Sequence, residues 1–281
     1  MAEWPELRQP IDDVRAAMTS LRWHQALRRR IPEAAAESRV RGAQASGELD
    51  GARLPVDQVR EYIAGVREWP ADPDPVDEVV RGVIAATAAT EDVRGYVLTA
   101  PAQALARLHV AAVGHLPQES GDAADGGPGD GLGRPRRAGE SCGELIELGE
   151  APDPSEVTER LALLGDVLRG HAGLPGVVVA AIAHGEIAAL RPFRRANGVV
   201  ARALERSLVQ ATGLDPTGVA VPELGHFRQG MTAYVGALSA YTSGSRDGVR
   251  LWLEHCCAAL VAAADEGRAV ADAVLAGRLP S

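Results

Sequence analysis

The chain has 281 residues, of which 46% are apolar, so it can bury a sizeable core in one large or two smaller domains. Aromatic residues make up only 4%, and the abundance of Ala, Leu, Val and Arg favours helices over a β-sandwich. The net charge of −9 argues against a general nucleic-acid binder, which usually needs a basic domain.

The sequence also indicates a compartment. No apolar run reaches the roughly 18 residues of a transmembrane helix, and the first residues are polar with no signal-peptide core. The three cysteines, Cys142, Cys256 and Cys257, lack metal-ligand spacing. We therefore expect a cytoplasmic protein with reduced thiols, no membrane partner and no metal site.

Apolar residues recur at helical spacing along most of the chain, after a loose arm at residues 1–10. Asp153-Pro154 shows a typical helix start, with an N-cap residue followed by proline in the first turn. The expected helices cover residues 11–31, 32–40, 54–70, 76–90, 99–109, 153–168, 175 to the loop at 191, 199–212, 224–241, 249–264 and 265–281. The pattern predicts an all-α fold.

Two stretches depart from this helical pattern. Residues 117–139 are rich in Gly, Asp and Pro, which predicts a disordered insertion because they cannot bury enough apolar surface. Residues Ser141 to Gly149 alternate in a way that suits a short exposed β-hairpin, which Pro152 would end.

A basic loop between two expected helices is the main candidate site. An apolar helix ends at Pro192-Phe193, and a second helix opens a few residues later. Unpaired N–H groups at a helix N-terminus, together with nearby guanidinium groups, form a plausible phosphate or anion site. The alternative is a basic turn that is simply solvated. The candidate ligands are Arg194, Arg195, Asn197, Gly198 and Arg202.

The same loop resembles the signature of the Fic family, His-Pro-Phe-x-Asp/Glu-Gly-Asn-Gly-Arg-x-x-Arg. Pro192, Phe193, Asn197, Gly198 and Arg202 fall in register with it. The resemblance implies a Fic-like helical bundle with a β-hairpin flap at 141–149 that docks a target protein. It also implies transfer of AMP from ATP to a hydroxyl of that target.

The departures from the signature bear on this chemistry. Arg191 stands where the family has its catalytic His, Arg195 replaces the acidic metal ligand, Ala196 the first Gly and Val199 the first Arg. An Arg cannot accept a proton near neutral pH, and a guanidinium cannot coordinate magnesium. We therefore expect AMP transfer to be lost. ATP or another phosphate ligand stays compatible with the loop, whereas magnesium does not.

Residues 45–51 resemble an inhibitory motif of many Fic proteins, Ser/Thr-x-x-x-Glu-Gly/Asn. Ser46 and Gly51 match it, and Asp50 stands in the Glu position, one methylene shorter. In the family the Glu reaches the first motif Arg and blocks productive ATP binding. Because that Arg is Val199 here, Asp50 would have to reach Arg202 or Arg195. The alternative is an ordinary helix C-terminus with Gly51 as its left-handed cap.

The resemblance divides the chain into an N-terminal helical region (1–98), a Fic-like core (99–264) and a C-terminal helix (265–281). Three functions stay open. The first is a degenerate Fic protein that binds a nucleotide, phosphate or partner. The second is an active transferase with another base. His184 is the spare imidazole but lies roughly 10 Å along the helix from Arg191, and His171 and His226 cannot be placed. The third is a helical interaction domain without ligand, including a homodimer.

Overall fold

The computed structural model describes residues 4–116 and 131–277 of the chain. Within these ranges it contains eleven α-helices, two short 3-10 helices and no β-strand. The α-helices are α1 (Pro5–Arg22), α2 (Ile31–Leu49), α3 (Val56–Ile63), α4 (Pro75–Val93), α5 (Pro101–Val113), α6 (Pro154–Arg169), α7 (Gly176–Leu190), α8 (Asn197–Ala211), α9 (Pro222–Gln229), α10 (Met231–Thr242) and α11 (Arg246–Leu275). The 3-10 helices are η1 (Gln25–Arg28) and η2 (Ile146–Leu148). The all-α prediction is confirmed.

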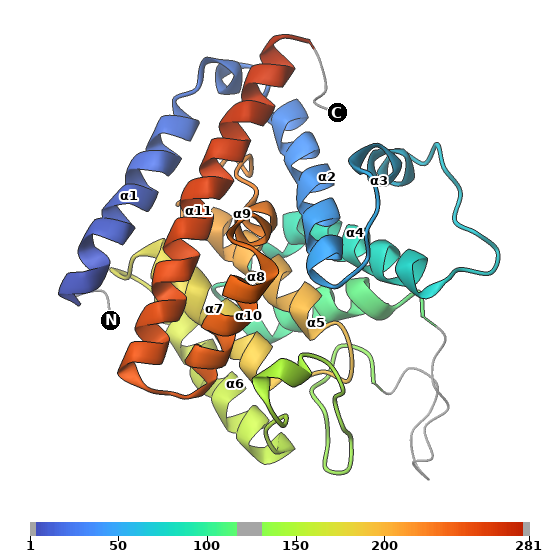
Figure 1. The fold of residues 1–281 in the computed structure, drawn as a ribbon, viewed down its shortest axis with the longest axis vertical. Helices are drawn as coiled ribbons and strands as arrows, with labels where there is room; N and C mark the ends of the chain where they lie inside the picture. The colour runs from blue at the N-terminus through green and yellow to red at the C-terminus, as the bar shows by residue number, and fades with distance from the viewer. Residues whose placement is uncertain (1–3, 117–130, 278–281) are drawn as a thin grey trace.

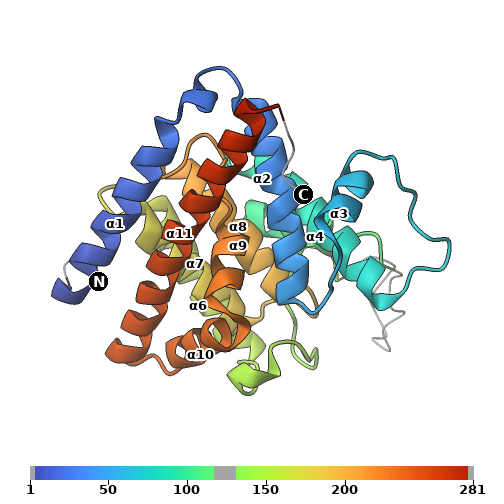
Figure 2. The ribbon, with the colours of Figure 1, turned by 45° about the horizontal axis from the view of Figure 1, so that its top comes forward.

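Helices α7 and α8 lie in the middle of the bundle and pack along each other (Figure 1). The long helix α11 contacts α1, α9 and α10 on one side, while α4 and α5 pair on another and contact α8. Helix α3 and its connection to α4 project on the side away from α1 in both views (Figure 2). The loop between α7 and α8 is therefore held by two central helices.

The sequence explains why α7 and α8 are central. Helix α7 is apolar on all sides, and nearly all of its residues are buried, as expected for a helix without a polar face. Helix α8 buries polar side chains as well, among them Asn197, Arg202, Glu205 and Arg206. Burial of such groups is costly unless each finds a partner, so α8 must carry polar networks into the core.

A close contact brings α9 against α11. A Cβ atom at Gly225 would lie 2.0 Å from the carbonyl oxygen of Ala259, so only glycine permits this approach. The next residue, His226, is consequently held in the core, where its exposed fraction is 0%.

Three expected boundaries are wrong. The loose arm expected at residues 1–10 is wrong for residues 5–10, because α1 begins at Pro5, a residue suited to a first turn. The helix expected at 11–31 breaks at His24, whose backbone is extended and whose ring accepts the N–H of Ala26. The helix expected at 224–241 is interrupted by Gly230, whose φ of +90° is incompatible with a right-handed helix.

The C-terminal region is one continuous helix. Helix α11 runs through the boundary expected between 264 and 265. Helix α2, from the first expected region, contacts α9 and α11, and α4 contacts α8, so the two sides of the expected boundary at 98 share one core. In the described part of the chain, no helix combines the length and apolarity that crossing a membrane requires.

The β-hairpin expected from Ser141 to Gly149 does not form. This stretch is irregular apart from η2, and Leu145 has a left-handed backbone with φ of +51°. The carbonyl groups of Leu145 and Gly149 accept hydrogen bonds from Arg191 instead of from a second strand. The first part of the insertion expected at 117–139, residues 117–130, lies outside the described residues. Its last part is ordered around Arg136, which is only 5% exposed.

Candidate functional site

The loop between α7 and α8 has a fixed shape. Arg191 ends α7 in a left-handed conformation (φ +46°, ψ +60°), and Ala196 is left-handed immediately before α8 (φ +62°, ψ +24°). Between these two turns, the Asn197 side chain accepts the Phe193 N–H (2.8 Å) and donates to the Phe193 carbonyl (2.9 Å). A single buried amide therefore closes the loop onto the start of α8.

The first N–H groups of α8 bind a carboxylate of this same chain. Glu144 Oε1 accepts the Ala196 N–H (2.6 Å), and Oε2 accepts the Asn197 N–H (2.9 Å) and the Asn197 side-chain amide (3.0 Å). Burial raises the pKa of Glu144, and the hydrogen bonds from Asn197 and Ala196 oppose that rise. The helix N-terminus is thus an anion site with an internal occupant.

Arg202 lies one turn into α8 and is held by the end of α2. Its Nε donates to Ser46 Oγ (2.8 Å), and its Nη2 donates to the Ser46 carbonyl (3.2 Å) and to Asp50 Oδ2 (2.6 Å). Burial acts to lower the pKa of Arg202, but the Asp50 charge and Tyr234 outweigh it, and the pKa is raised. The guanidinium is 1% exposed and permanently charged.

Asp50 is both a helix C-cap and a partner of Arg202, so both interpretations of its motif apply. It is the C-cap of α2, and Gly51 follows with a φ of +80°, as the cap interpretation requires. Its side chain nevertheless reaches Arg202 rather than Arg195, and it lies beside the start of α8. A Cβ atom at Gly198 would be 3.1 Å from Asp50 Oδ1. The Asp50 side chain is still 22% exposed, so solvent reaches this edge of the site.

Arg191 binds backbone carbonyl groups of the segment 145–150. Its Nη1 donates to the carbonyls of Leu145 (3.2 Å) and Gly149 (2.7 Å), and its Nη2 donates to that of Glu150 (2.8 Å). The residue is 2% exposed, and burial lowers the pKa of its guanidinium. This side chain fastens the segment 145–150 to the end of α7.

Arg136 binds the α7–α8 loop through hydrogen bonds to backbone carbonyls. It was not predicted as a site residue. Its backbone N–H donates to the Pro192 carbonyl (2.7 Å), and its Nε donates to the Arg191 carbonyl (2.8 Å). Its two Nη atoms donate to the carbonyls of Glu140 (3.0 Å) and Pro152 (3.1 Å). One buried guanidinium thereby joins the segment that carries Glu144 to the α7–α8 loop.

The remaining loop residues differ in exposure. Arg194 and Arg195 are exposed at the tip of the loop. Phe193 is buried and stacks on His109 at a ring separation of 3.9 Å. Burial lowers the pKa of His109 to about 4, so this imidazole is neutral and acts in packing.

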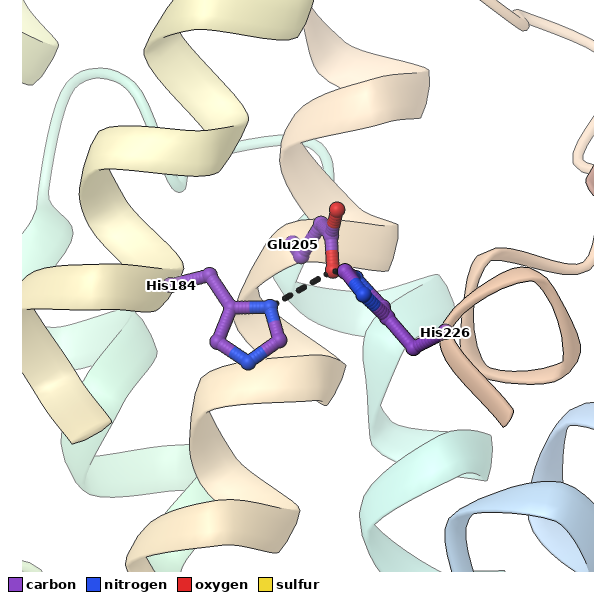
Figure 3. A group of neighbouring side chains, drawn as sticks. All are labelled: His184, Glu205 and His226. Carbon is purple, nitrogen blue, oxygen red and sulfur yellow. Dashed lines mark hydrogen bonds and ion pairs between the residues drawn. The ribbon is translucent and has the colours of Figure 1, made fainter. Parts of the chain in front are cut away.

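A polar cluster lies deeper in the core (Figure 3). His184 Nδ1 and His226 Nε2 each lie 2.7 Å from Glu205 Oε2, and all three side chains are 0% exposed. Burial lowers the pKa of His184 to about 4. Burial alone would raise the pKa of Glu205, but His226 and His184 hold it below its usual range.

The cluster has a link to the anion site. His184 Nε2 lies 2.8 Å from the Tyr234 hydroxyl, and Tyr234, after Asp50, contributes to the raised pKa of Arg202.

No protein-family model and no curated protein matches this chain. Solved structures do match it. A Fic family protein from Desulfovibrio desulfuricans G20 has a TM-score of 0.71 at 18% identity, over 100% of this chain and 78% of that one. Fic-1 (residues 134–508) from C. elegans has a TM-score of 0.63 at 19% identity, over 91% and 71%. A Fic domain containing signaling protein from Bacteroides thetaiotaomicron has a TM-score of 0.63 at 13% identity, over 97% and 100%.

Proposed function

This chain has the Fic fold, and we propose that it binds a phosphate-bearing ligand, with a nucleotide as the first candidate, and does not transfer AMP. The observation that carries the proposal is the Glu144 carboxylate, which is bound by the Ala196 and Asn197 N–H groups at the start of α8. A pair of N–H groups that binds carboxylate oxygens offers the same donors to phosphate oxygens.

The resident carboxylate and a phosphate ligand would compete. Glu144 and Asp50 together place two negative charges near the start of α8, and the Asp50 charge contributes to the raised pKa of Glu144. A phosphate group carries more negative charge than one carboxylate and so gains more from the helix N-terminus and from Arg202. We therefore propose that the ligand displaces Glu144 and takes over its two N–H donors.

The residues at the positions that AMP transfer would need support the proposed loss of this activity. Arg191 is a permanent cation bonded to the carbonyls of Gly149 and Glu150, so it cannot remove a proton from a hydroxyl. Arg195 offers no oxygen ligand to magnesium. The spare imidazole, His184, is 0% exposed and bonded to Glu205 and Tyr234, out of reach of an external substrate.

Calorimetric titration with ATP, with and without magnesium, tests the proposal on four proteins: the wild type, Glu144→Ala, Glu147→Ala and the double variant Glu144→Ala/Arg202→Ala. Glu147 is the matched control, because it is an exposed carboxylate on the same segment. We expect Glu144→Ala to bind ATP at least about tenfold more tightly than the wild type, independently of magnesium. Glu147→Ala should bind like the wild type, and adding Arg202→Ala should abolish the gain.

Two outcomes would contradict the proposal. A folded Glu144→Ala protein that binds neither ATP, ADP nor AMP would remove the nucleotide version. Covalent labelling of any protein by radiolabelled ATP in the presence of the wild-type chain would contradict the loss of transfer, and its disappearance in His184→Ala would identify an alternative base.

A protein partner is the second candidate, and one observation favours it. Ile146 on the segment Ser141–Gly149 is 71% exposed, although Arg191 holds this segment against the core. A fixed segment that presents an apolar side chain beside the anion site suits contact with a target protein or a second copy of this chain. Loss of a copurifying partner or of self-association in Ile146→Ser, with unchanged thermal stability, would support this function.

A further inference from the structure

Three side chains of types that can bind a metal come from three helices and meet in the core, outside the anion site. His184 comes from α7, Glu205 from α8 and His226 from α9 (Figure 3). One ligand atom from each residue, two imidazole nitrogens and a carboxylate oxygen, lies within 4.8 Å of the other two. Two imidazoles and one carboxylate are a donor set that zinc and its first-row neighbours bind.

One atom of this cluster lacks a partner. Glu205 Oε2 is shared by both histidines, whereas Oε1 is buried and has no hydrogen-bond partner among residues 4–116 and 131–277. A buried carboxylate oxygen left unpaired costs free energy, because it has given up water without gaining a donor. A cation bound at the cluster would remove that cost, since the carboxylate could use both oxygens as ligands.

The far side of each imidazole is already supported. His184 Nε2 lies 2.8 Å from the Tyr234 hydroxyl, and His226 Nδ1 lies 3.1 Å from His255 Nε2. Metal-ligating histidines are usually held in this way, with the second ring nitrogen bonded to a neighbour that fixes the orientation of the ring. The outer shell expected of a metal centre is thus present around both candidate ligands.

We propose that His184 Nδ1, His226 Nε2 and both oxygens of the Glu205 carboxylate form a closed, four-coordinate divalent-metal site that takes zinc. Zinc bonds of about 2.1 Å at near-tetrahedral angles place a nitrogen ligand roughly 3.4 Å from a carboxylate oxygen. The carboxylate therefore has to withdraw from each nitrogen by roughly 0.7 Å. Because all three side chains are 0% exposed, the metal is structural: it fastens α7, α8 and α9 together, and no substrate reaches it.

The competing account is a plain hydrogen-bond network. In that account Tyr234 donates to His184, and both His184 and His226 donate to Glu205, without any metal. This account leaves Glu205 Oε1 unpaired, and it predicts no stoichiometric metal. The two accounts therefore differ in measurements that do not depend on any activity of the protein.

The experiment is metal analysis of the full chain, purified without a histidine tag. We expect about one zinc per chain by mass spectrometry of the purified protein. After removal of metal by a chelator, Zn²⁺ at about a hundred times its Kd should raise the Tm by roughly 5 °C. Cobalt should bind in the same ratio and show the visible absorption of a metal with nitrogen and oxygen ligands.

Two substitutions locate the site. Glu205→Gln keeps the side-chain volume and should weaken zinc binding at least about tenfold. His171→Gln should bind zinc like the wild type, because that histidine is bonded to the Leu168 carbonyl and does not belong to the cluster. If Glu205→Gln fails to fold, the cobalt spectrum of the wild-type chain still decides. A metal-free wild-type protein that gives no cobalt absorption and no rise in Tm with Zn²⁺ would overturn the proposal, as would unchanged zinc affinity in folded Glu205→Gln.

Discussion

Replacing Arg191 by Ala should release the segment 145–150 from the end of α7. The Arg191 side chain donates three hydrogen bonds to the carbonyls of Leu145, Gly149 and Glu150, at 3.2, 2.7 and 2.8 Å. Alanine removes all three hydrogen bonds and keeps only the Cβ atom of the side chain. The same substitution should also loosen Glu144, which belongs to this segment and fills the anion site.

The expected loss follows from these contacts. Hydrogen bonds with a charged donor contribute roughly 1.5–3 kcal/mol each, so three give roughly 4.5–9 kcal/mol before any offset. Two effects reduce that figure. Arg191 Nε is buried without a partner, which costs the native protein about 1–3 kcal/mol, and Gly149 and Glu150 are exposed, so their freed carbonyls regain water. We expect a net loss of about 2–4 kcal/mol in the stability of this segment.

Hydrogen exchange and urea unfolding of Arg191→Ala measure this loss. Exchange should accelerate in peptides that cover 141–150 and change little in α4 and α5. Arg191→Gly serves as the matched comparison, because glycine suits the φ of +46° and should recover about 1 kcal/mol relative to alanine. If Arg191→Ala changes exchange at 141–150 by less than a factor of two, the guanidinium does not hold the segment and the reasoning is refuted.

Three further predictions concern single residues. Ala196→Gly should raise the free energy of unfolding by about 1 kcal/mol, because Ala196 has a φ of +62°; unchanged urea midpoints would contradict this. Asp50→Asn should lower the Tm, since Arg202 then loses its nearest negative charge, and an unaltered Tm would show that this contact is not stabilising. The pKa of Glu140 is lowered to about 2 by Arg134, so its contribution to stability is present above about pH 4.5 and is lost as the pH falls toward 2. Glu140→Gln should therefore be less stable than the wild type at pH 7, with a difference that shrinks at pH 3.

Local signals in the sequence placed most helices correctly. Asp153 caps α6 by accepting the Ser155 N–H (2.9 Å), as its position before Pro154 indicates. The missed breaks have local causes that periodicity does not register: the ring of His24 competes for a backbone N–H, and Gly230 takes a φ of +90°. Apolar spacing continues through both positions, so the pattern alone gives one helix where the chain has two.

The candidate site was predictable only in part. The loop and a contact from Asp50 could be predicted because their residues occur in the order of known motifs. Of the two expected partners of Asp50, the contact is made with Arg202. Glu144 was missed, because the alternation in 141–149 indicated a hairpin and gave its carboxylate no role. Glu205 was missed, and His226 could be named but not placed, for a different reason. They meet His184 from separate helices, and helical spacing within one segment carries no information about contacts between segments.

The central claim is that the start of α8 is an anion receptor and that Glu144 fills it. Calorimetric titration of Glu144→Ala with inorganic pyrophosphate tests this claim most directly, because this probe carries phosphate oxygens without a base or sugar. The account predicts one site per chain, competition with ATP, and at least about tenfold weaker binding to the wild type. A correctly folded Glu144→Ala protein that takes up no pyrophosphate would contradict it.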